Sequence, residues 1–337
     1  MIDIALDARL TPPMSVGMKA YAAQMTARLP GVAPDLRFAT FTQGANFSLD
    51  EQLVFPLRLA RARPRLTHFL SLYAPLLAPR PFVITIHDLI HLRFPQFVKR
   101  RVGPYYHTVV RSVCARAARV LTDDEKTIGD LRALLGVAPE KVRVVALGVD
   151  DVYLAPVIPE IAQRPYFLYA GNHRPHKDLP TLLNAWAALP EDVAVDLWLT
   201  GDDDLPPAWH TTRRNGTLRF LGDVTNERLA GLYAGSVALV HGALCEGFGL
   251  SMLEAAAVGV RVIATAEAAP SVLAPHMECF PARDTQALSA LMAQALEQPE
   301  PGRRDALRTI ARGLTWDRCA RATAEVYREV LAESEAR

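Results

Sequence analysis

The first 150 residues alternate between short apolar runs and longer stretches in which apolar residues recur at helical spacing. The short runs have the length and composition of buried strands, and the longer stretches predict amphipathic helices. The predicted strands cover residues 2–6, 82–86, 120–122 and 142–145, and the predicted helices cover about 17–29, 103–117 and 124–135. Because such alternation is typical of a parallel sheet with helices on both faces, this half predicts a doubly wound α/β domain.

The same alternation starts again at residue 166. It predicts strands over 166–170, 195–199, 218–221, 237–240 and 261–265, and helices from near Asp178, over 226–234, after Gly249, over about 284–297 and over 316–334. Between the halves, residues 150–165 contain three prolines and predict a hinge. We therefore expect two Rossmann-like domains, 1–155 and 156–315, and a last helix within 316–337. Ligands of such sheets bind beyond the carboxyl ends of the strands, so the expected site is the cleft between the domains.

Length and composition limit the class of protein. The 337 residues are enough for two domains of ordinary size, each with its own core. No run of about 18 residues is apolar throughout, so we expect no segment that spans a bilayer. The cysteines are widely spaced, without the pattern of a zinc site or a redox pair, and this usage is typical of the reducing cytoplasm. They are Cys114, Cys245, Cys279 and Cys319.

Charge is divided unevenly along the chain, although its net value is only +1. Residues 1–150 hold 20 lysines and arginines against 12 aspartates and glutamates, and the remainder holds 17 against 24. The basic half could attract anionic lipid, a phosphorylated acceptor or nucleic acid, or it could be a solvated surface or face the acidic half. Two clusters favour a partner: Arg58, Arg61, Arg63 and Arg65, and Lys99, Arg100 and Arg101. Neither is interleaved with aromatic residues, so we expect contact with the inner face of an anionic plasma membrane rather than with nucleic acid.

The most informative stretch covers residues 245–254 and reads Cys-Glu-Gly-Phe-Gly-Leu-Ser-Met-Leu-Glu. A glycine-rich turn there follows a predicted strand and runs straight into a predicted helix. Gly247 and Gly249 let the backbone approach a ligand closely, and the first amides of the helix are unpaired donors at the positive end of its dipole. This combination predicts a binding site for a diphosphate.

The two glutamates of this stretch, Glu246 and Glu254, lie too far apart for glycoside hydrolysis of the retaining kind. With Glu246 in the turn and Glu254 inside the helix, a rise of about 1.5 Å per residue separates their carboxylates by roughly 10 Å. The carboxylates of a retaining glycosidase lie only about 5 Å apart. The larger distance is about the span from hexose to ribose in a nucleotide sugar, so the pattern favours that ligand over a helix whose acids are merely solvated.

Polar residues at other strand ends could complete such a site. His87 follows a predicted strand and could exchange a hydrogen bond or a proton with a sugar, although a lone histidine is more often structural. Arg174 and Lys177 follow the first strand of the second half, where they could neutralise a diphosphate. Gly17 opens the first helix and would let the acceptor or the donor phosphates approach, unless it only belongs to a helix start rich in small residues.

Together these motifs resemble those of the retaining glycosyltransferases of family 4, which have the GT-B architecture, over nearly the whole chain. The strongest match runs from Glu246-Gly247-Phe248-Gly249-Leu250 to Glu254-Ala255. Weaker matches follow the family's order: Thr85-Ile86-His87-Asp88, Leu147-Gly148-Val149, Gly171 with Lys177, Phe220-Leu221-Gly222-Asp223-Val224, and Gly259 with Val262-Ile263-Ala264. The resemblance implies two Rossmann-like domains facing a deep cleft, the first for the acceptor and the second for the donor, with the last helix crossing back to the first.

The resemblance also implies a role for each matched position. Glu254 would hold the ribose hydroxyls, and Glu246 would face the donor sugar. Lys177, with Arg174, would hold the diphosphate, and His87 would lie near the anomeric carbon from the other domain. The backbone would supply the remaining donor contacts, at Val224, Gly247, Phe248, Gly249 and Leu250.

In the mechanism usually discussed for such enzymes, the leaving phosphate takes the proton of the acceptor, so the resemblance implies no protein nucleophile, metal ion or cofactor. The run Asp202–Asp204 does not change this, because three consecutive acids rarely converge on one ion. Some positions depart from the family pattern: Asp124, Asn172, His241 with Gly242, Ser251 and Ser271. Since both glutamates and the lysine are present, we expect an active enzyme.

We therefore expect a retaining hexosyltransferase that extends a bacterial glycan or lipid-linked glycan from a nucleotide sugar, with mannose as the first candidate. The departures leave a second hypothesis open, a non-catalytic GT-B module that binds a nucleotide or a partner and scaffolds a glycan assembly complex. An epimerase on the same fold would need further catalytic acids and histidines. A nicotinamide oxidoreductase is disfavoured because no Gly-x-Gly-x-x-Gly follows the first strand of either domain.

Overall fold

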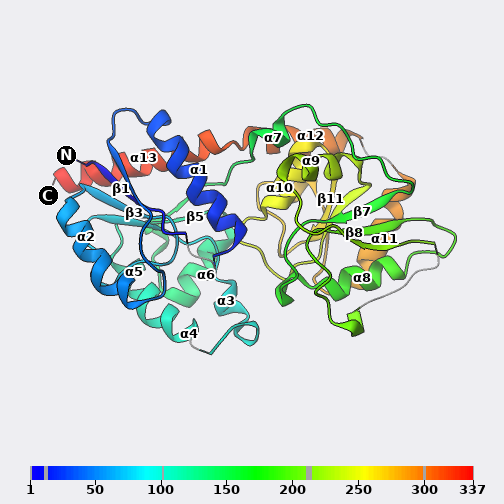
Figure 1. Ribbon diagram of the computed structural model, residues 1–337, viewed down its shortest axis with the longest axis horizontal. Helices are drawn as coiled ribbons and strands as arrows, with labels where there is room; N and C mark the ends of the chain where they lie inside the picture. The colour runs from blue at the N-terminus through cyan, green and yellow to red at the C-terminus, as the bar shows by residue number, and fades with distance from the viewer. Residues whose placement is uncertain (1, 11–13, 101, 210–214, 299–300, 337) are drawn as a thin grey trace. The chain divides into compact units, whose positions relative to one another are not determined.

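The computed structural model describes residues 2–10, 14–100, 102–209, 215–298 and 301–336. The chain forms two compact units, the first made of Met1–Gly148 with Thr315–Arg337 and the second of Val149–Leu314 (Figure 1). The sequence predicts these divisions after residues 155 and 315, seven residues and one residue later. Each unit holds one all-parallel sheet between helices, which is the doubly wound architecture expected from the sequence.

The sheet of the first unit has the strand order β2-β1-β3-β4-β5-β6. Its strands are β1 (Ile4–Asp7), β2 (Phe38–Phe41), β3 (Leu66–Phe69), β4 (Phe82–Thr85), β5 (Arg119–Thr122) and β6 (Val142–Val144). Every neighbouring pair is parallel. Because side chains alternate along a strand, Phe69 and Ile84 point to one face and His68 and Thr85 to the other.

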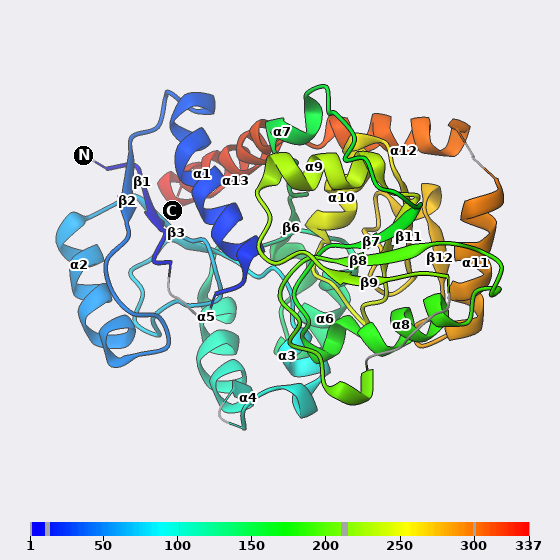
Figure 2. The same ribbon diagram turned by 45° about the vertical axis from the view of Figure 1, so that its right-hand side comes forward.

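Helices cover both faces of this sheet (Figure 2). The face of Phe69 packs on α2, α5 and α6 through buried apolar side chains. The opposite face packs on α1 and α13, which lie side by side although they are the first and last helices of the chain. The helical segments of this unit are α1 (Val16–Val32), η1 (Asp50–Val54), α2 (Phe55–Ala62), α3 (Ile90–Arg93), η2 (Pro95–Phe97), α4 (Val102–Tyr105), η3 (Tyr106–Val110), α5 (Arg111–Arg116), α6 (Lys126–Leu135), η4 (Pro139–Lys141) and α13 (Trp316–Glu335).

A buried polar network attaches α13 to this sheet. The Nδ1 atom of His68 lies 2.5 Å from the hydroxyl of Tyr327, and its Nε2 atom lies 2.8 Å from Oγ1 of Thr85. Thr85 in turn lies 3.1 Å from the hydroxyl of Tyr21 on α1. Burial lowers the pKa of His68 to about 3, with a further contribution from His87, so the ring is neutral and both nitrogens serve the network. The last helix is therefore a structural part of the first unit.

The sheet of the second unit has the order β12-β11-β10-β7-β8-β9, again parallel throughout. Its strands are β7 (Tyr166–Tyr169), β8 (Asp196–Leu199), β9 (Leu218–Phe220), β10 (Ala238–His241), β11 (Arg261–Thr265) and β12 (Glu278–Phe280). The chain runs outward from β7 to β9 and then returns to the other side of β7. Strand order thus reverses between β7 and β10, and ligands of such sheets bind beyond the carboxyl ends of the strands at this point.

Helices α8 and α11 pack on one face of this sheet and α9, α10 and α12 on the other (Figure 2). The helical segments are α7 (Asp151–Leu154), η5 (Pro175–Lys177), α8 (Leu179–Ala187), η6 (Pro207–Trp209), α9 (Asn226–Gly235), α10 (Leu250–Val258), η7 (Ala274–His276), α11 (Thr285–Glu297) and α12 (Pro301–Gly313). Within the described residues, no helix is long and apolar enough to cross a bilayer.

The predicted strands and helices are all present, most with ends shifted by one to three residues. The sequence missed the short strands β2, β3 and β12 and the helices α2 and α12. Residues 150–165, the predicted hinge, belong to the second unit, where Tyr153 on α7 is buried and the amide of Glu160 donates to the carbonyl of Gly231 over 2.9 Å. Their role as a hinge stays a prediction.

Tyr327→Phe removes the hydroxyl that bonds Nδ1 of His68 and leaves that buried nitrogen without its partner. We expect the free energy of unfolding to fall by about 1–3 kcal/mol, the usual cost of a buried polar group that loses its hydrogen bond. Equilibrium urea denaturation measures the loss. Arg328→Ala, at the neighbouring position, removes an ion pair with Asp35 on the surface and should cost markedly less. Equal losses in the two variants would contradict a stabilising role for the network.

Candidate functional site

The turn between β10 and α10 has the geometry that the sequence predicted. Gly249 is the N-cap of α10 and adopts a left-handed conformation with φ of 87°. This backbone conformation favours glycine, whereas the nearest atom to a Cβ there, the terminal methyl of Met252 at 2.2 Å, belongs to a flexible side chain that can shift. Helix α10 begins at Leu250, which leaves its first amides at the carboxyl edge of the sheet.

Two loops meet at the point where strand order reverses. The loop after β10 donates a hydrogen bond from the amide of Leu244 to the carbonyl of His176, over 2.8 Å, in the loop after β7. Between them, a Cβ atom on Gly242 would lie 3.4 Å from the carbonyl oxygen of Asp178 and 3.7 Å from that of Lys177. The two loops carry Glu246 and Lys177, which the sequence assigns to the same ligand.

Glu246 is bound by two basic side chains. The ammonium group of Lys177 forms an ion pair with its Oε1 atom, and Nε2 of His241 lies 3.2 Å from the same oxygen. All three side chains are largely shielded, at 12% exposure for Glu246, 11% for Lys177 and 1% for His241. Burial alone would raise the pKa of Glu246, but Lys177 and His241 outweigh it and hold the pKa well below its usual range. Glu246 is therefore ionised at any physiological pH.

Glu254 lies in the opposite electrostatic environment, although it is only two turns further along. Its Oε2 atom accepts a hydrogen bond from the hydroxyl of Tyr233 on α9 over 3.0 Å. Burial raises the pKa of Glu254 to about 8, and the nearby charge of Asp150 adds to the shift. Tyr153 on α7 packs against Tyr233 with ring centroids 6.0 Å apart. The hydroxyl of Tyr153 is buried without a hydrogen-bond partner among the described residues.

The other residues predicted to contact the donor differ in their exposure to solvent. The side chain of Arg174 is exposed at the start of η5, where it is open to solvent. Val224 lies in the loop between β9 and α9, just before the N-cap Thr225. Phe248 is buried in the turn, and Gly247 beside it is buried as well.

The acidic run after β8, Asp202–Asp204, contains a carboxylate that pairs with a histidine. The carboxylate of Asp204 pairs with Nδ1 of His173, whose Nε2 atom lies 2.9 Å from the carbonyl of Thr200. Across the described ranges, no group of three or more His, Cys, Asp and Glu residues could hold a metal ion.

In the first unit, His87 forms a pair that the sequence did not predict. Its Nδ1 atom lies 2.7 Å from Oδ2 of Asp123, which follows β5, and its ring packs edge-on against Tyr21 at 4.7 Å. Burial lowers the pKa of His87, but Asp123 outweighs it, so the net pKa is raised. The Nε2 atom is buried and without a hydrogen-bond partner in the described part of the chain. Gly17 lies in the first turn of α1, after the N-cap Ser15. The roles of His87 and Gly17 stay predictions.

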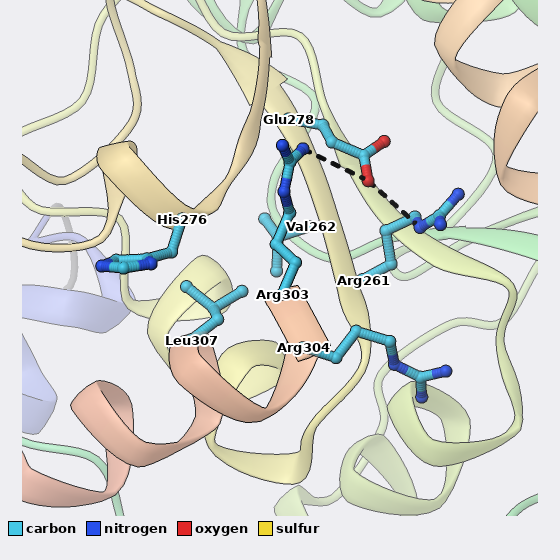
Figure 3. A pocket seen from close by; sticks show the side chains of 7 residues that line it. All are labelled: Arg261, Val262, His276, Glu278, Arg303, Arg304 and Leu307. Carbon is cyan, nitrogen blue, oxygen red and sulfur yellow. Dashed lines mark ion pairs between the residues drawn. The ribbon is translucent and has the colours of Figure 1, made fainter. Parts of the chain in front are cut away.

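The second unit also has a hollow, at the edge of its sheet opposite to the turn that carries Glu246. Its lining includes Arg261 and Glu278, the first residues of β11 and β12, and therefore faces the amino ends of the strands (Figure 3). Glu278 lies 3.2 Å from Arg261 and 4.0 Å from Arg303, while Arg304 donates to the carbonyl of Gly259 over 2.9 Å. These contacts hold α12 to the sheet and are separate from the turn that carries Glu246.

Sequence reasoning missed His241, Tyr233, Tyr153 and Asp123 as members of these sites. His241 was noted only as a departure from the family pattern, and Asp123 precedes another such departure. No local pattern marks the two tyrosines, since they come from helices that meet α10 in space. Their approach is a product of packing rather than of sequence spacing.

Comparison with known proteins agrees with this geometry. A family model described as glycosyl transferases group 1 matches residues 164–298, and one described as Glycosyltransferase Family 4 matches residues 21–153. The second match covers β2 to β6 of the first unit, and the first match covers the whole sheet of the second unit. The chain is therefore a glycosyltransferase, with the Family 4 model in its first unit and the group 1 model in its second. Its motif at 246–254 and Lys177 lie within the first match, and His87 lies within the second.

Relatives of this glycosyltransferase include two mannosyltransferases. O-antigen chain mannosyltransferase B of Escherichia coli is 27% identical over 271 residues, which cover 73% of this chain and 70% of the relative. The MMP alpha-(1->4)-mannosyltransferase of Mycolicibacterium hassiacum is 29% identical over 236 residues, which cover 66% of this chain and 56% of the relative. These names support glycosyl transfer in the building of bacterial polysaccharides.

Solved structures show the same fold. Sucrose-phosphate synthase from Thermosynechococcus elongatus has a TM-score of 0.74 at 18% identity and covers 99% of this chain and 100% of its own. Anabaena HepE, solved in complex with UDP and glucose, has a TM-score of 0.71 at 16% identity over 98% of this chain and 100% of its own. This glycosyltransferase therefore has the GT-B fold.

Glu254→Gln should stabilise the enzyme increasingly as pH rises. The folded-state pKa of about 8 lies above that of an unfolded glutamate, so the native state binds the extra proton and wild-type stability falls between about pH 4.5 and 8. The neutral amide avoids this loss, so the gain in free energy of unfolding should grow by about 1–3 kcal/mol from pH 5 to pH 8. Urea denaturation across this range measures it. Glu191→Gln, in an exposed loop of the same unit, should show no such trend. If the difference in free energy of unfolding between Glu254→Gln and the wild type did not change with pH, it would contradict the shifted pKa.

Proposed function

We propose that this glycosyltransferase is a retaining, metal-independent hexosyltransferase of bacterial polysaccharide biosynthesis, acting in the cytoplasm on a glycan or lipid-linked glycan acceptor. The observation that carries the proposal is a pair of carboxylates in opposite electrostatic environments, Glu246 in the turn and Glu254 in the helix that follows it. Glu246 is held ionised by Lys177 and His241, whereas Glu254 is held in a poorly solvated position beside two tyrosines. Two carboxylates with such different partners suit a ligand that has a diphosphate at its centre and a sugar at each end.

The donor would lie along the turn and the start of α10. Glu254 would accept hydrogen bonds from the ribose hydroxyls, since its buried carboxyl group gains most from such donors. Lys177, exposed Arg174 and the first amides of α10 would neutralise the diphosphate. Glu246 would accept a hydrogen bond from the hexose through Oε2, because Lys177 and His241 both contact Oε1.

Transfer needs no nucleophile from the protein. The bond between the anomeric carbon and the phosphate oxygen breaks, the acceptor oxygen bonds to that carbon on the same face, and its proton passes to the leaving phosphate. A carboxylate as strongly paired as Glu246 is a weak base, which supports this route over covalent catalysis. The cations at the diphosphate would stabilise the charge that develops on the leaving group.

Mannose is the sugar that we propose, with GDP-mannose as donor. Both of the relatives described above are named as mannosyltransferases. The experiment is to incubate the purified chain with GDP-, UDP- and dTDP-sugars and lipid-linked acceptors, with and without EDTA. Turnover of one donor, unaffected by EDTA and with the anomeric configuration retained by NMR, is the expected result. Donor binding without any transfer or hydrolysis would favour the non-catalytic scaffold, and failure to bind any donor would rule out both.

Within this function, Glu254→Ala should weaken donor binding more than Glu246→Ala. The ribose contact exists in the ground and transition states alike, whereas the hexose contact of Glu246 counts most during transfer. We expect a rise of about 10- to 100-fold in the donor Kd for Glu254→Ala, the cost of one or two lost hydrogen bonds. Glu246→Ala should mainly lower kcat. Calorimetry with the donor, combined with steady-state kinetics, distinguishes the two, and the reverse order would contradict the assignment.

We also propose that the first unit contacts an anionic membrane surface. Leu49, Leu53 and Leu57 recur every four residues along η1 and α2, at 77%, 60% and 62% exposure, so they form one apolar row. The basic side chain of Arg61 continues the row by one more turn, which is the arrangement of a helix that lies on a lipid surface. Of the predicted basic clusters, Arg65 is instead paired with Asp3 and Glu335, and Arg101 lies outside the described residues.

Leu53→Ser with Leu57→Ser should weaken binding to vesicles that contain about one third phosphatidylglycerol by about 30-fold or more, since each leucine loses roughly 1 kcal/mol or more of apolar burial. Cosedimentation measures the binding. Ile158→Ser with Ile161→Ser is the matched control, because these residues of the second unit are 89% and 94% exposed and should not contribute. Equal binding by both double variants, or binding that neutral vesicles reproduce, would exclude this surface.

A further inference from the structure

His241 is one of the residues of the proposed donor site that the sequence analysis did not place there. It ends β10, where the family pattern has proline, and it is 1% exposed. Its ring stacks on that of Tyr169 at the end of the neighbouring strand β7, with centroids 6.0 Å apart and an angle of 29° between the planes. Packing of this kind fixes the direction of the ring, so the position of its Nε2 atom is set by the sheet.

The contact with Glu246 fixes the protonation of that atom. Nε2 of His241 lies 3.2 Å from Oε1 of Glu246, and the low pKa of Glu246 makes it an acceptor without a proton. Nε2 must therefore carry a hydrogen and donate it. Glu246 thus has two donors on one oxygen, a rigid one from His241 and a flexible one from Lys177.

We propose that His241 is a positioning residue that holds Glu246 in place when Lys177 turns to the donor diphosphate. This inference rests on the proposed function, in which the arriving phosphates compete with Glu246 for Lys177. A buried carboxylate that loses its ion-pair partner is strongly destabilised unless another donor remains. His241 is that donor, and it keeps Oε2 of Glu246 directed at the hexose during transfer.

A stability cycle tests the positioning role without any need for turnover. Lys177→Met removes the ammonium group and mimics its departure to the phosphate. His241→Phe keeps the ring against Tyr169 but lacks the donor, so it should lower Tm at least twice as much in the Lys177→Met background as in the wild type. Equal losses in both backgrounds would show that His241 does not compensate for Lys177 and would overturn the proposal.

Kinetics test its part in transfer. His241→Phe should lower kcat by about 10- to 100-fold, as expected for one lost donor to a buried charge, and change the donor KM less than threefold. His241→Gln, which restores an N–H donor, should recover most of the rate. In a Glu246→Gln background His241→Phe should have little further effect, because the two residues act as a unit.

The outcomes distinguish a failure of the proposed function from a failure of the positioning role of His241. If the wild-type enzyme turns over no donor, the proposed function fails, and the stability cycle still decides whether His241 supports Glu246. If the wild type is active but His241→Phe raises KM alone, or acts additively with Glu246→Gln, then His241 is a packing residue and the positioning role is wrong.

Discussion

The proposed donor site depends on the need of one largely shielded carboxylate, that of Glu246, for compensating charge. Glu246 could not stay ionised in its turn without Lys177 and His241, and these three residues come from two loops and the end of a strand. The parallel sheet brings the loops together because β7 and β10 are neighbours where strand order reverses. The amide of Leu244 then joins the two loops by donating to the carbonyl of His176. Charge and topology therefore act on the same point of the structure.

Glu254 shows how much a short distance along one helix can change. It has the same side chain as Glu246, but a tyrosine hydroxyl as its partner instead of a cation, and its pKa moves upward rather than downward. The enzyme thus carries one carboxylate that is satisfied before a ligand arrives and one that is not. The second gains most from new hydrogen-bond donors, which is the property expected of the group that holds ribose.

The family motif and the chain's own departures from it supply different residues of the proposed donor site. The motif supplies the two glutamates, the glycines of the turn and the lysine, as family membership implies. At His241 the chain differs from its family pattern, and this residue contacts the central carboxylate. In the first unit, His87 has Asp123 as a partner, and α13 is joined to the sheet through His68. The departure at His241 therefore adds a contact to the central carboxylate and is no sign of lost function by itself.

The sequence by itself determined the fold class and the turn at 246–254, because apolar periodicity and glycine conformation are local properties that short stretches express without help. It also determined which strand ends carry charged residues. The tertiary structure alone brings Lys177 and His241 to one oxygen of Glu246, the hydroxyl of Tyr233 on α9 to Glu254, and Tyr153 on α7 to the ring of Tyr233. The strands β2, β3 and β12 were missed because each is only three or four residues long and mixes apolar with polar residues. Three or four residues carry too little periodic signal, and their pairing in the sheet is what defines them.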